Sequence, residues 1–224
     1  MNSSLENNSK KKIALLFSGS PATKLKHIQN QFSTITRDQI YDIFAVDKGL
    51  EICHKMNLPV HKIIGDMDSV DHHILNDFSS DIIMQFPKRK DLSDTDLAIE
   101  YLLNKNYQKI YIFSAIGGRI DHQLFIVLSL LKSPGNIILL TDQGLLWALS
   151  PKIAHQISME KNQTFSLIPL SRCKDVDLNG CEYPLHNEDL LLDSRTLSNV
   201  AKGSIQIQFD KGKLLFYKHV EKRQ

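Results

Sequence analysis

Three carboxylates follow one short apolar segment of this 224-residue chain. Residues 62–71 read KIIGDMDSVD, in which the β-branched Ile63 and Ile64 are typical of a buried strand. The carboxylates that follow are Asp66, Asp68 and Asp71. Two explanations are open: the aspartates shape a turn by bonding to their own backbone, or they hold a cation.

Charged residues and glycines follow three further segments that read as strands. After residues 41–46 come Asp47, Lys48 and Gly49; after residues 81–87 come Lys88, Arg89, Lys90, Asp91 and then Asp94; after residues 109–116 come Gly117, Gly118, Arg119, Asp121 and His122. Open α/β sheets bind their ligands beyond the carboxyl ends of the strands. We therefore expect these side chains to gather at one edge of a sheet.

The residue types at these strand ends fit one class of ligand. Carboxylates and water hold magnesium (Mg²⁺), a hard cation. Basic side chains pair with phosphate oxygens, and glycines let backbone N–H groups approach an anion. A Mg²⁺–nucleotide is the simplest ligand that satisfies all three. The chain has neither a G-x-x-x-x-G-K-[ST] phosphate loop nor a G-x-G-x-x-G dinucleotide fingerprint.

Each motif alone also has a purely structural explanation. GDMDS can be a turn stabilised by its own aspartates, and Asp94 and Asp96 suit a helix N-terminus electrostatically. The basic residues 88–90 can be a solvated loop, and GGR a tight turn. If there were no ligand, all four structural explanations would have to hold independently at four successive strand ends. Because that would be a coincidence, the pattern favours a ligand site.

The elements that position these residues alternate between strand and helix. Strands are expected within residues 13–20, 41–49, 61–69, 81–87, 109–119, 136–144 and 145–150, and helices within 22–39, 50–58, 92–106 and 120–132. Ser93 is a suitable helix cap. This alternation predicts an α/β fold with a mainly parallel sheet and flanking helices.

The pattern changes near residue 151 to short strands separated by turn residues. Strands are expected within residues 165–171, 174–180, 190–199 and 204–220, with a hairpin turn at 210–213. The sequence therefore predicts a flexible tail at residues 1–12, an α/β domain at 13–150 and a small all-β, sandwich-like domain at 151–224.

Composition excludes several classes of protein. The formal net charge of +2 argues against a dedicated nucleic-acid binder. The longest apolar run, residues 124–131, is too short to span a bilayer, and the polar N-terminus lacks the apolar core of a secretory signal. The cysteines are Cys53, Cys173 and Cys181, an odd number without a C-x-x-C pair, which favours a reducing, cytoplasmic setting.

The order of motifs resembles that of the thiamine pyrophosphokinase family. The motifs are VDKG, IIGDMDS, KDLSDTDLAI, GGRIDH, EYPL and LSN, and they run from Asp47 to the C-terminal strands. The resemblance implies an α/β domain joined to a β-sandwich, in a homodimer that holds thiamine between subunits. It also implies ATP as co-substrate and Mg²⁺ as cofactor.

The resemblance also implies a role for each site residue. Mg²⁺ would be bound by Asp66, Asp68 and Asp94. The ATP site would be formed by Asp47, Lys48, Lys90, Asp91, Arg119, Asp121 and His122. Ser198 and Asn199 would face the thiamine pyrimidine, and either Asp91 or Asp94 would accept the hydroxyl proton.

The implied reaction is transfer of a diphosphoryl group from ATP to the hydroxyl of thiamine, which yields AMP and thiamine diphosphate. Two alternatives stay open at this point. One is diphosphoryl transfer to another alcohol, such as a hydroxymethylpterin. The other is a non-catalytic sensor that binds a Mg²⁺–nucleotide.

The chain departs from the family pattern at several positions. The family's D-G-G-A-N is here Asp47-Lys48-Gly49-Leu50-Glu51, so a lysine replaces a glycine and a glutamate replaces an asparagine. Lys48 either alters the contact there or serves phosphate. Ser93 stands where threonine is usual, and Ile126 where many relatives have asparagine.

Overall fold

The computed structural model describes residues 12–20, 24–88 and 91–220. The predicted tail, apart from Lys12, lies outside these residues. Contacts divide the chain into two compact units, residues 1–19 with 24–111 and residues 20–23 with 112–224. The domain boundary predicted near residue 150 rests on the change in type of secondary structure and not on contacts. That boundary stays a prediction.

The first unit is built on parallel strands. They are β1 (Ile13–Phe17), β2 (Tyr41–Val46), β3 (Lys62–Gly65) and β4 (Ile83–Gln85). β1 pairs with β2, β2 with β3 and β3 with β4, each in parallel. The N–H of Ala14 donates to the C=O of Lys109 (2.8 Å), on the other side of β1. Every residue of β1 is buried, as expected for a parallel strand covered on both faces.

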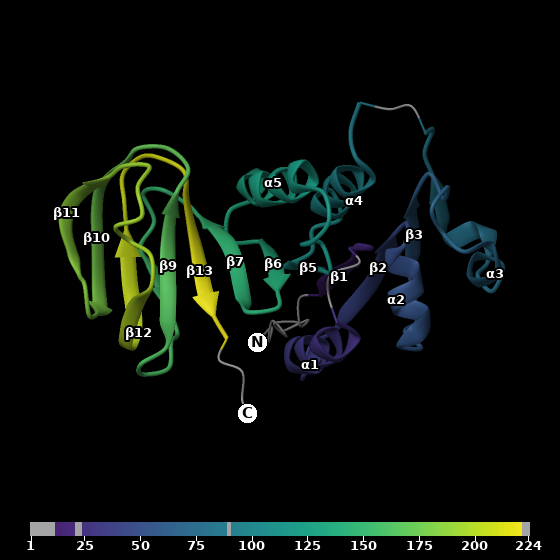
Figure 1. The fold of residues 1–224 in the computed structure, drawn as a ribbon, viewed down its shortest axis with the longest axis horizontal. Helices are drawn as coiled ribbons and strands as arrows, with labels where there is room; N and C mark the ends of the chain where they lie inside the picture. Colours follow the sequence, from purple (N-terminus) through teal and green to yellow (C-terminus); the bar gives the residue numbers. More distant parts are fainter. Residues whose placement is uncertain (1–11, 21–23, 89–90, 221–224) are drawn as a thin grey trace, which may run out of the picture. The chain divides into compact units, whose positions relative to one another are not determined.

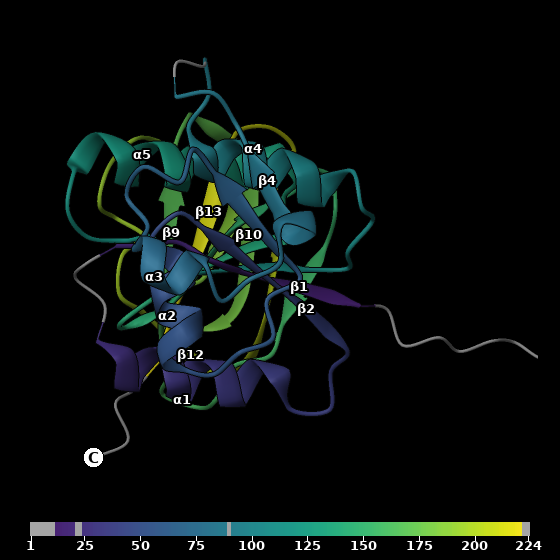
Figure 2. The same ribbon diagram turned by 90° about the vertical axis from the view of Figure 1, so that its right-hand side faces the viewer.

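Helices cover both faces of these strands (Figures 1 and 2). The helical segments are α1 (Leu25–Thr36), α2 (Gly49–Lys55), α3 (His72–Leu75), η1 (Ser80–Ile82) and α4 (Asp94–Leu103). α2 packs on β1 and β2, whereas α4 packs on β2 and β3 from the opposite face. Because α4 begins beyond the carboxyl ends of β2 and β3, its first turn lies near the residues that follow those strands.

The second unit opens with a helix and an antiparallel pair. The chain passes from β5 (Ile110–Phe113) to α5 (Ile120–Ser129) and η2 (Leu130–Lys132), then to β6 (Ile137–Thr141) and β7 (Gly144–Leu149). β6 pairs with β7, and β7 pairs with the C-terminal strand β13 (Leu214–His219), both antiparallel.

The rest of the second unit is a β-sandwich. Its strands are β8 (His155–Ile157), β9 (Thr164–Pro169), β10 (Cys173–Cys181), β11 (Leu185–Leu190) and β12 (Asn199–Gln208), which join β13 (Figure 1). β12 pairs first with β9 and then with β10 and β8, so one strand takes part in both sheets. Between the sheets lies a core in which the rings of Phe165 and Phe216 stack 5.3 Å apart.

The prediction of a mainly parallel sheet is wrong. The strands pair in parallel from β1 to β4, but the pairings of β6 and β7 and those within the sandwich are antiparallel, so the sheet is mixed and mostly antiparallel. The physical reason is the short turn at residues 142–143, which can join only antiparallel neighbours. The flanking helices and the β-rich second part are confirmed.

Two further expectations in the C-terminal part are wrong. The turn at residues 210–213 joins β12 to β13, but β9 lies between these strands, so they do not form a hairpin. Residues 191–198 are a loop rather than a strand. None of the described helices is long and apolar enough to cross a membrane.

Candidate active site

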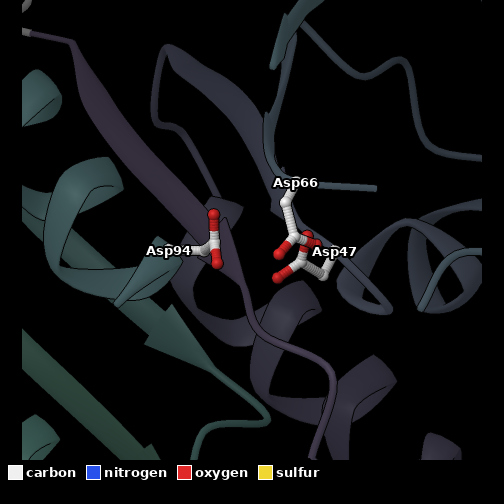
Figure 3. Close-up of side chains that lie close together, drawn as sticks. All are labelled: Asp47, Asp66 and Asp94. Carbon is white, nitrogen blue, oxygen red and sulfur yellow. The ribbon is translucent and has the colours of Figure 1, made fainter. Parts of the chain in front are cut away.

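Three carboxylates converge in the first unit. One oxygen each from Asp47, Asp66 and Asp94 lies within 4.8 Å of the other two, and all three residues are half-buried. Asp47 follows β2, Asp66 follows β3 and Asp94 opens α4. Figure 3 shows the three side chains turned toward one another. The arrangement presents a set of oxygen ligands suited to a hard divalent cation.

Asp47 reaches this position because Gly65 has no side chain. A Cβ on Gly65 would lie 1.9 Å from Oδ1 of Asp47. The backbone of Asp47 is in the left-handed region, with φ 43°, which aspartate tolerates better than most residues. Its N–H donates to the C=O of Ile64 (3.2 Å), and its C=O accepts from the N–H of Leu50 (3.0 Å). These bonds tie Asp47 to β3 on one side and to α2 on the other.

Asp66 both shapes a turn and faces the other acids. Its Oδ1 accepts the N–H of Asp68 (3.1 Å), which is the local turn considered above as a structural explanation. The residue between them, Met67, is buried and has φ 63°. The C=O of Asp66 accepts from Nε2 of Gln85 (3.3 Å) on the neighbouring strand. The turn and the ligand explanation are therefore compatible.

Asp94 is positioned by a helix cap. Oγ of Ser93 accepts the N–H of Asp96 (3.2 Å), which confirms the predicted cap. Acidic residues in the first turn interact favourably with the helix dipole. Because α4 packs on β2 and β3, this cap brings Asp94 to the ends of those strands.

Asp68 is not one of the three converging carboxylates. It is exposed, and its Oδ2 lies 2.6 Å from Nζ of Lys88. This hydrogen bond and the carboxylate charge raise the pKa of Lys88 above its ordinary value. Asp47, which the resemblance assigned to the ATP site, stands with Asp66 and Asp94 instead. The signal in the sequence was the position of Asp47 directly after an expected strand, at the same expected edge of the sheet as Asp66.

The remaining residues of the expected nucleotide site are divided between the two units. Lys90 lies outside the described residues, and Asp91 is exposed. Arg119, Asp121 and His122 lie together at the start of α5 in the second unit. Nε of Arg119 bonds to Oδ1 of Asp121 (3.1 Å), and the Arg119 hydrogen bonds lower the pKa of that carboxyl to about 2.

The two residues expected to face thiamine differ in exposure. Ser198 is exposed and has φ 56°, and its N–H donates to Oγ of Ser166 (3.0 Å). Asn199 is buried, and its carboxamide bonds to the main chain of Tyr183. The side chain of Asn199 therefore points toward the protein interior.

Comparison with known proteins assigns the family. The chain matches the family "Thiamin pyrophosphokinase, catalytic domain" over residues 36–139 and the family "Thiamin pyrophosphokinase, vitamin B1 binding domain" over residues 154–214. It is 30% identical to the thiamine pyrophosphokinase of Bacillus subtilis (strain 168) over 156 residues, 67% of this chain and 73% of that protein. The chain belongs to the thiamine pyrophosphokinase family.

Solved structures of thiamine pyrophosphokinases share the fold. The crystal structure of the Bacillus subtilis enzyme matches with a TM-score of 0.80 and 25% identity, over 94% of this chain and 100% of that one. The enzyme from Geobacillus thermodenitrificans matches with a TM-score of 0.79 and 23% identity, over 95% and 99% of the two chains.

The structure accounts for one departure from the pattern of the thiamine pyrophosphokinase family. Lys48 stands in place of the family's first glycine, and its φ of −58° and ψ of −12° are helical values that any residue adopts. The second glycine, Gly49, is kept for a physical reason: a Cβ there would lie 2.0 Å from the C=O oxygen of Phe17. Lys48 is exposed, one residue beyond Asp47.

Proposed function

We propose that this protein is a thiamine diphosphokinase, which transfers a diphosphoryl group from ATP to the hydroxyl of thiamine to give thiamine diphosphate and AMP. The observation that carries the proposal is the convergence of Asp47, Asp66 and Asp94 inside the segment that matches the catalytic-domain family. The match of residues 154–214 to a vitamin B1 binding domain favours thiamine over a hydroxymethylpterin as acceptor.

The three carboxylates would hold Mg²⁺. Mg²⁺ is usually bound by a few carboxylates together with waters and substrate phosphates, and oxygens within 4.8 Å of one another fit that donor set. The ion would neutralise the transferred group, since phosphoryl chemistry depends mainly on positioning and on charge stabilisation. Asp68 is retained as a further candidate ligand, which would have to leave Lys88 to take part.

The chain's other polar residues would orient the nucleotide. We assign Lys48, Lys90 and Arg119 to the ATP phosphates, as donors to oxygen, and Asp121 and His122 to the same site. Asp91 and Asp94 are the two candidates for accepting the thiamine hydroxyl proton. In this scheme residues 13–150 serve ATP and Mg²⁺, and residues 151–224 serve thiamine through Ser198 and Asn199.

We also propose that the active form is a homodimer in the cytoplasm. The family resemblance supports the dimer, as do the exposed apolar side chains along α5, which a second copy would cover: Ile120, Leu124, Phe125 and Leu128. The three cysteines are buried free thiols, which suits a reducing compartment. A sedimentation mass of one chain under assay conditions would contradict the dimer.

Incubation of the purified protein with ATP, Mg²⁺ and thiamine, followed by identification of the products, tests the activity. We expect AMP and thiamine diphosphate in equal amounts. A hydroxymethylpterin in place of thiamine tests the rival acceptor, and ATP binding without turnover would support the sensor.

A second readout does not depend on turnover. Mg²⁺ that binds only the folded state raises the unfolding temperature. The wild type should show this rise, and Asp66→Asn should lose it. An equal rise in both proteins would argue against a site at the three carboxylates.

A further inference from the structure

The loop that carries Asp66 is held by the end of the neighbouring strand. β3 and β4 pair in parallel up to Gly65 and Gln85, which are partners in the ladder. Just beyond this pair, the N–H of Phe86 donates to the C=O of Gly65 (2.9 Å). Nε2 of Gln85 donates to the C=O of Asp66 (3.3 Å). The end of β4 therefore binds two successive carbonyl groups at the point where β3 becomes a loop.

Asp66 lies beyond the regular part of β3, where the strand ladder no longer sets the path of the chain. β3 ends at Gly65, and Met67 is in the left-handed region with φ 63°. The loop is partly held from within, because Oδ1 of Asp66 accepts the N–H of Asp68 (3.1 Å) and the Met67 side chain is buried. The carboxamide of Gln85 adds an attachment from another strand, and it binds the residue that carries the carboxylate.

A second contact between the same two segments is an exposed ion pair. Nζ of Lys88 lies 2.6 Å from Oδ2 of Asp68, and 76% and 45% of these two side chains are exposed. Exposed ion pairs contribute up to about 1 kcal/mol and are weakened by salt. The hydrogen bond from Gln85 joins two neutral groups and acts on Asp66 itself, whereas Lys88 binds a carboxylate outside the cluster. Gln85 is therefore the better candidate for positioning the cluster.

The cluster needs main-chain attachments because its three carboxylates repel one another. In the absence of a cation, this repulsion favours rotation of an acidic side chain toward solvent. Asp47 is bonded to the main chains of β3 and α2, and Asp94 follows the helix cap of α4. For Asp66, the attachment from another element is the carboxamide of Gln85.

We propose that Gln85 is a positioning residue of the metal site. By bonding to the C=O of Asp66, it keeps the Asp66 carboxylate turned toward Asp47 and Asp94 (Figure 3), and it thereby strengthens the binding of Mg²⁺. Removal of a group that orients metal ligands from outside typically weakens metal binding by about 10–100-fold. This inference rests on the proposed function, because it takes the three carboxylates as ligands of Mg²⁺.

Binding of Mg²⁺ by the nucleotide-free protein tests the proposal. Gln85→Met keeps a side chain of similar length and removes its donor. The dissociation constant of Mg²⁺, measured by calorimetry and by the rise in unfolding temperature, should increase by about tenfold. The unfolding temperature without Mg²⁺ should stay that of the wild type, because Gln85 is exposed. In the activity assay, the Mg²⁺ concentration for half-maximal turnover should rise by the same factor, with maximal turnover unchanged.

Gln85→Glu separates positioning from charge. Glutamate has the shape of glutamine, but its carboxylate cannot donate to the C=O of Asp66. An added negative charge near the cluster would by itself attract Mg²⁺ more strongly, whereas loss of the donor weakens binding. We expect weaker binding than in the wild type. Gln39→Met is the matched control, because Gln39 is exposed just before the start of β2 and should leave the Mg²⁺ affinity unchanged.

Two results would overturn the proposal. An unchanged Mg²⁺ affinity in Gln85→Met would show that the hydrogen bond does not position Asp66, and with a lower unfolding temperature it would mean that Gln85 only stabilises β4. Equal or tighter binding in Gln85→Glu would mean that charge near the site decides the affinity. If Gln85→Met does not fold, Gln85→Thr takes its place, because threonine suits a strand and is too short to reach the C=O of Asp66.

The wild type separates this inference from the proposed function. A wild type that neither binds Mg²⁺ nor forms thiamine diphosphate would overturn both. A wild type that does both, with an unchanged Mg²⁺ affinity in Gln85→Met, would overturn this inference alone.

Discussion

The two ends of β2 carry aspartates in opposite electrostatic settings. Asp42, near the start of the strand, is 4% exposed, and its carboxylate contacts three donors. They are Nζ of Lys12 (2.6 Å), the hydroxyl of Tyr107 (2.7 Å) and Nε2 of His61. Asp47, just after the strand, lies instead with the carboxylates of Asp66 and Asp94.

The difference separates a carboxylate that is paired with donors from one that we propose to bind Mg²⁺. A buried charge is expensive unless it is paired and hydrogen-bonded. Lys12 and Tyr107 both contact Oδ2 of Asp42, and His61 lies beside Oδ1 as an ion-pair partner. Converging like charges have the opposite effect, because they repel one another. A cluster that opposes folding in this way is expected where function requires it. Five predictions test this contrast.

The largest effect is expected from Asp66→Asn. The substitution preserves the size of the side chain and removes its charge, so the variant should fold with unchanged or higher stability. Turnover should fall by at least about a hundredfold, as when a preorganised charge-stabilising group is removed. Steady-state kinetics and thermal unfolding check both parts. Near-normal turnover with an unchanged Mg²⁺ dependence would refute the metal site.

Asp68→Asn is the matched variant of Asp66→Asn, two residues along the same loop. Because Asp68 pairs with Lys88 outside the three-carboxylate cluster, we expect a smaller loss of turnover. An equal loss would mean that Asp68 leaves Lys88 and becomes a metal ligand during the reaction.

Asp42→Asn should have the reverse signature. We expect the free energy of unfolding to fall by about 2 kcal/mol, less than for a fully buried ion pair because Lys12 and His61 are 43% and 50% exposed. Turnover per folded molecule should change less than twofold. Denaturant unfolding measures the free energy of unfolding, and steady-state kinetics measure the turnover. A stability equal to that of the wild type would show that the contacts of the Asp42 charge do not stabilise the fold.

Gly65→Ala tests how the carboxylate of Asp47 is positioned and leaves the charges of the cluster unchanged. A Cβ at Gly65, where φ is 152°, would overlap Asp47, whereas Gly203 has φ 149° and open space around the same position. Both alanine variants should lose about 1–2 kcal/mol of stability through backbone strain. Only Gly65→Ala should also lose at least about tenfold in turnover, because Asp47 is displaced. Equal kinetics in the two variants would contradict this role of Gly65.

The smallest effect is expected from Tyr107 at high pH. Burial, together with the hydrogen bond to Asp42, raises the pKa of Tyr107. A raised pKa favours the neutral phenol in the folded state, so its contribution is complete below the ordinary value of about 10 and is lost as pH rises through the folded value. Tyr107→Phe should be less stable by about 1 kcal/mol at neutral pH.

Comparison of the two proteins across pH checks this prediction. The stability difference between wild type and Tyr107→Phe should shrink at alkaline pH. The comparison cancels the contribution of Cys53, whose pKa burial also raises. A difference that is independent of pH would contradict the role of Asp42 as acceptor.

The sequence by itself determined the positions of most elements within residues 13–150 and indicated the family. Local rules were sufficient for the apolar strands, for the Ser93 cap and for placing Asp47, Asp66 and Asp94 directly after strands or at a helix start. These signals depend on residues within a few positions of one another, which is the range over which propensity, capping and turn chemistry act. The order of motifs was sufficient to indicate the family.

Only the tertiary structure decided which side chains meet. Asp47 rather than Asp68 stands beside Asp66, because β2 is the parallel neighbour of β3 and Gly65 leaves room for the carboxylate. Asn199 faces inward, because the segment that contains Tyr183, distant in sequence, returns beside it. The antiparallel pairing of β7 with β13 joins segments even farther apart. Such contacts depend on strand order and loop conformation, which no local pattern of residues encodes.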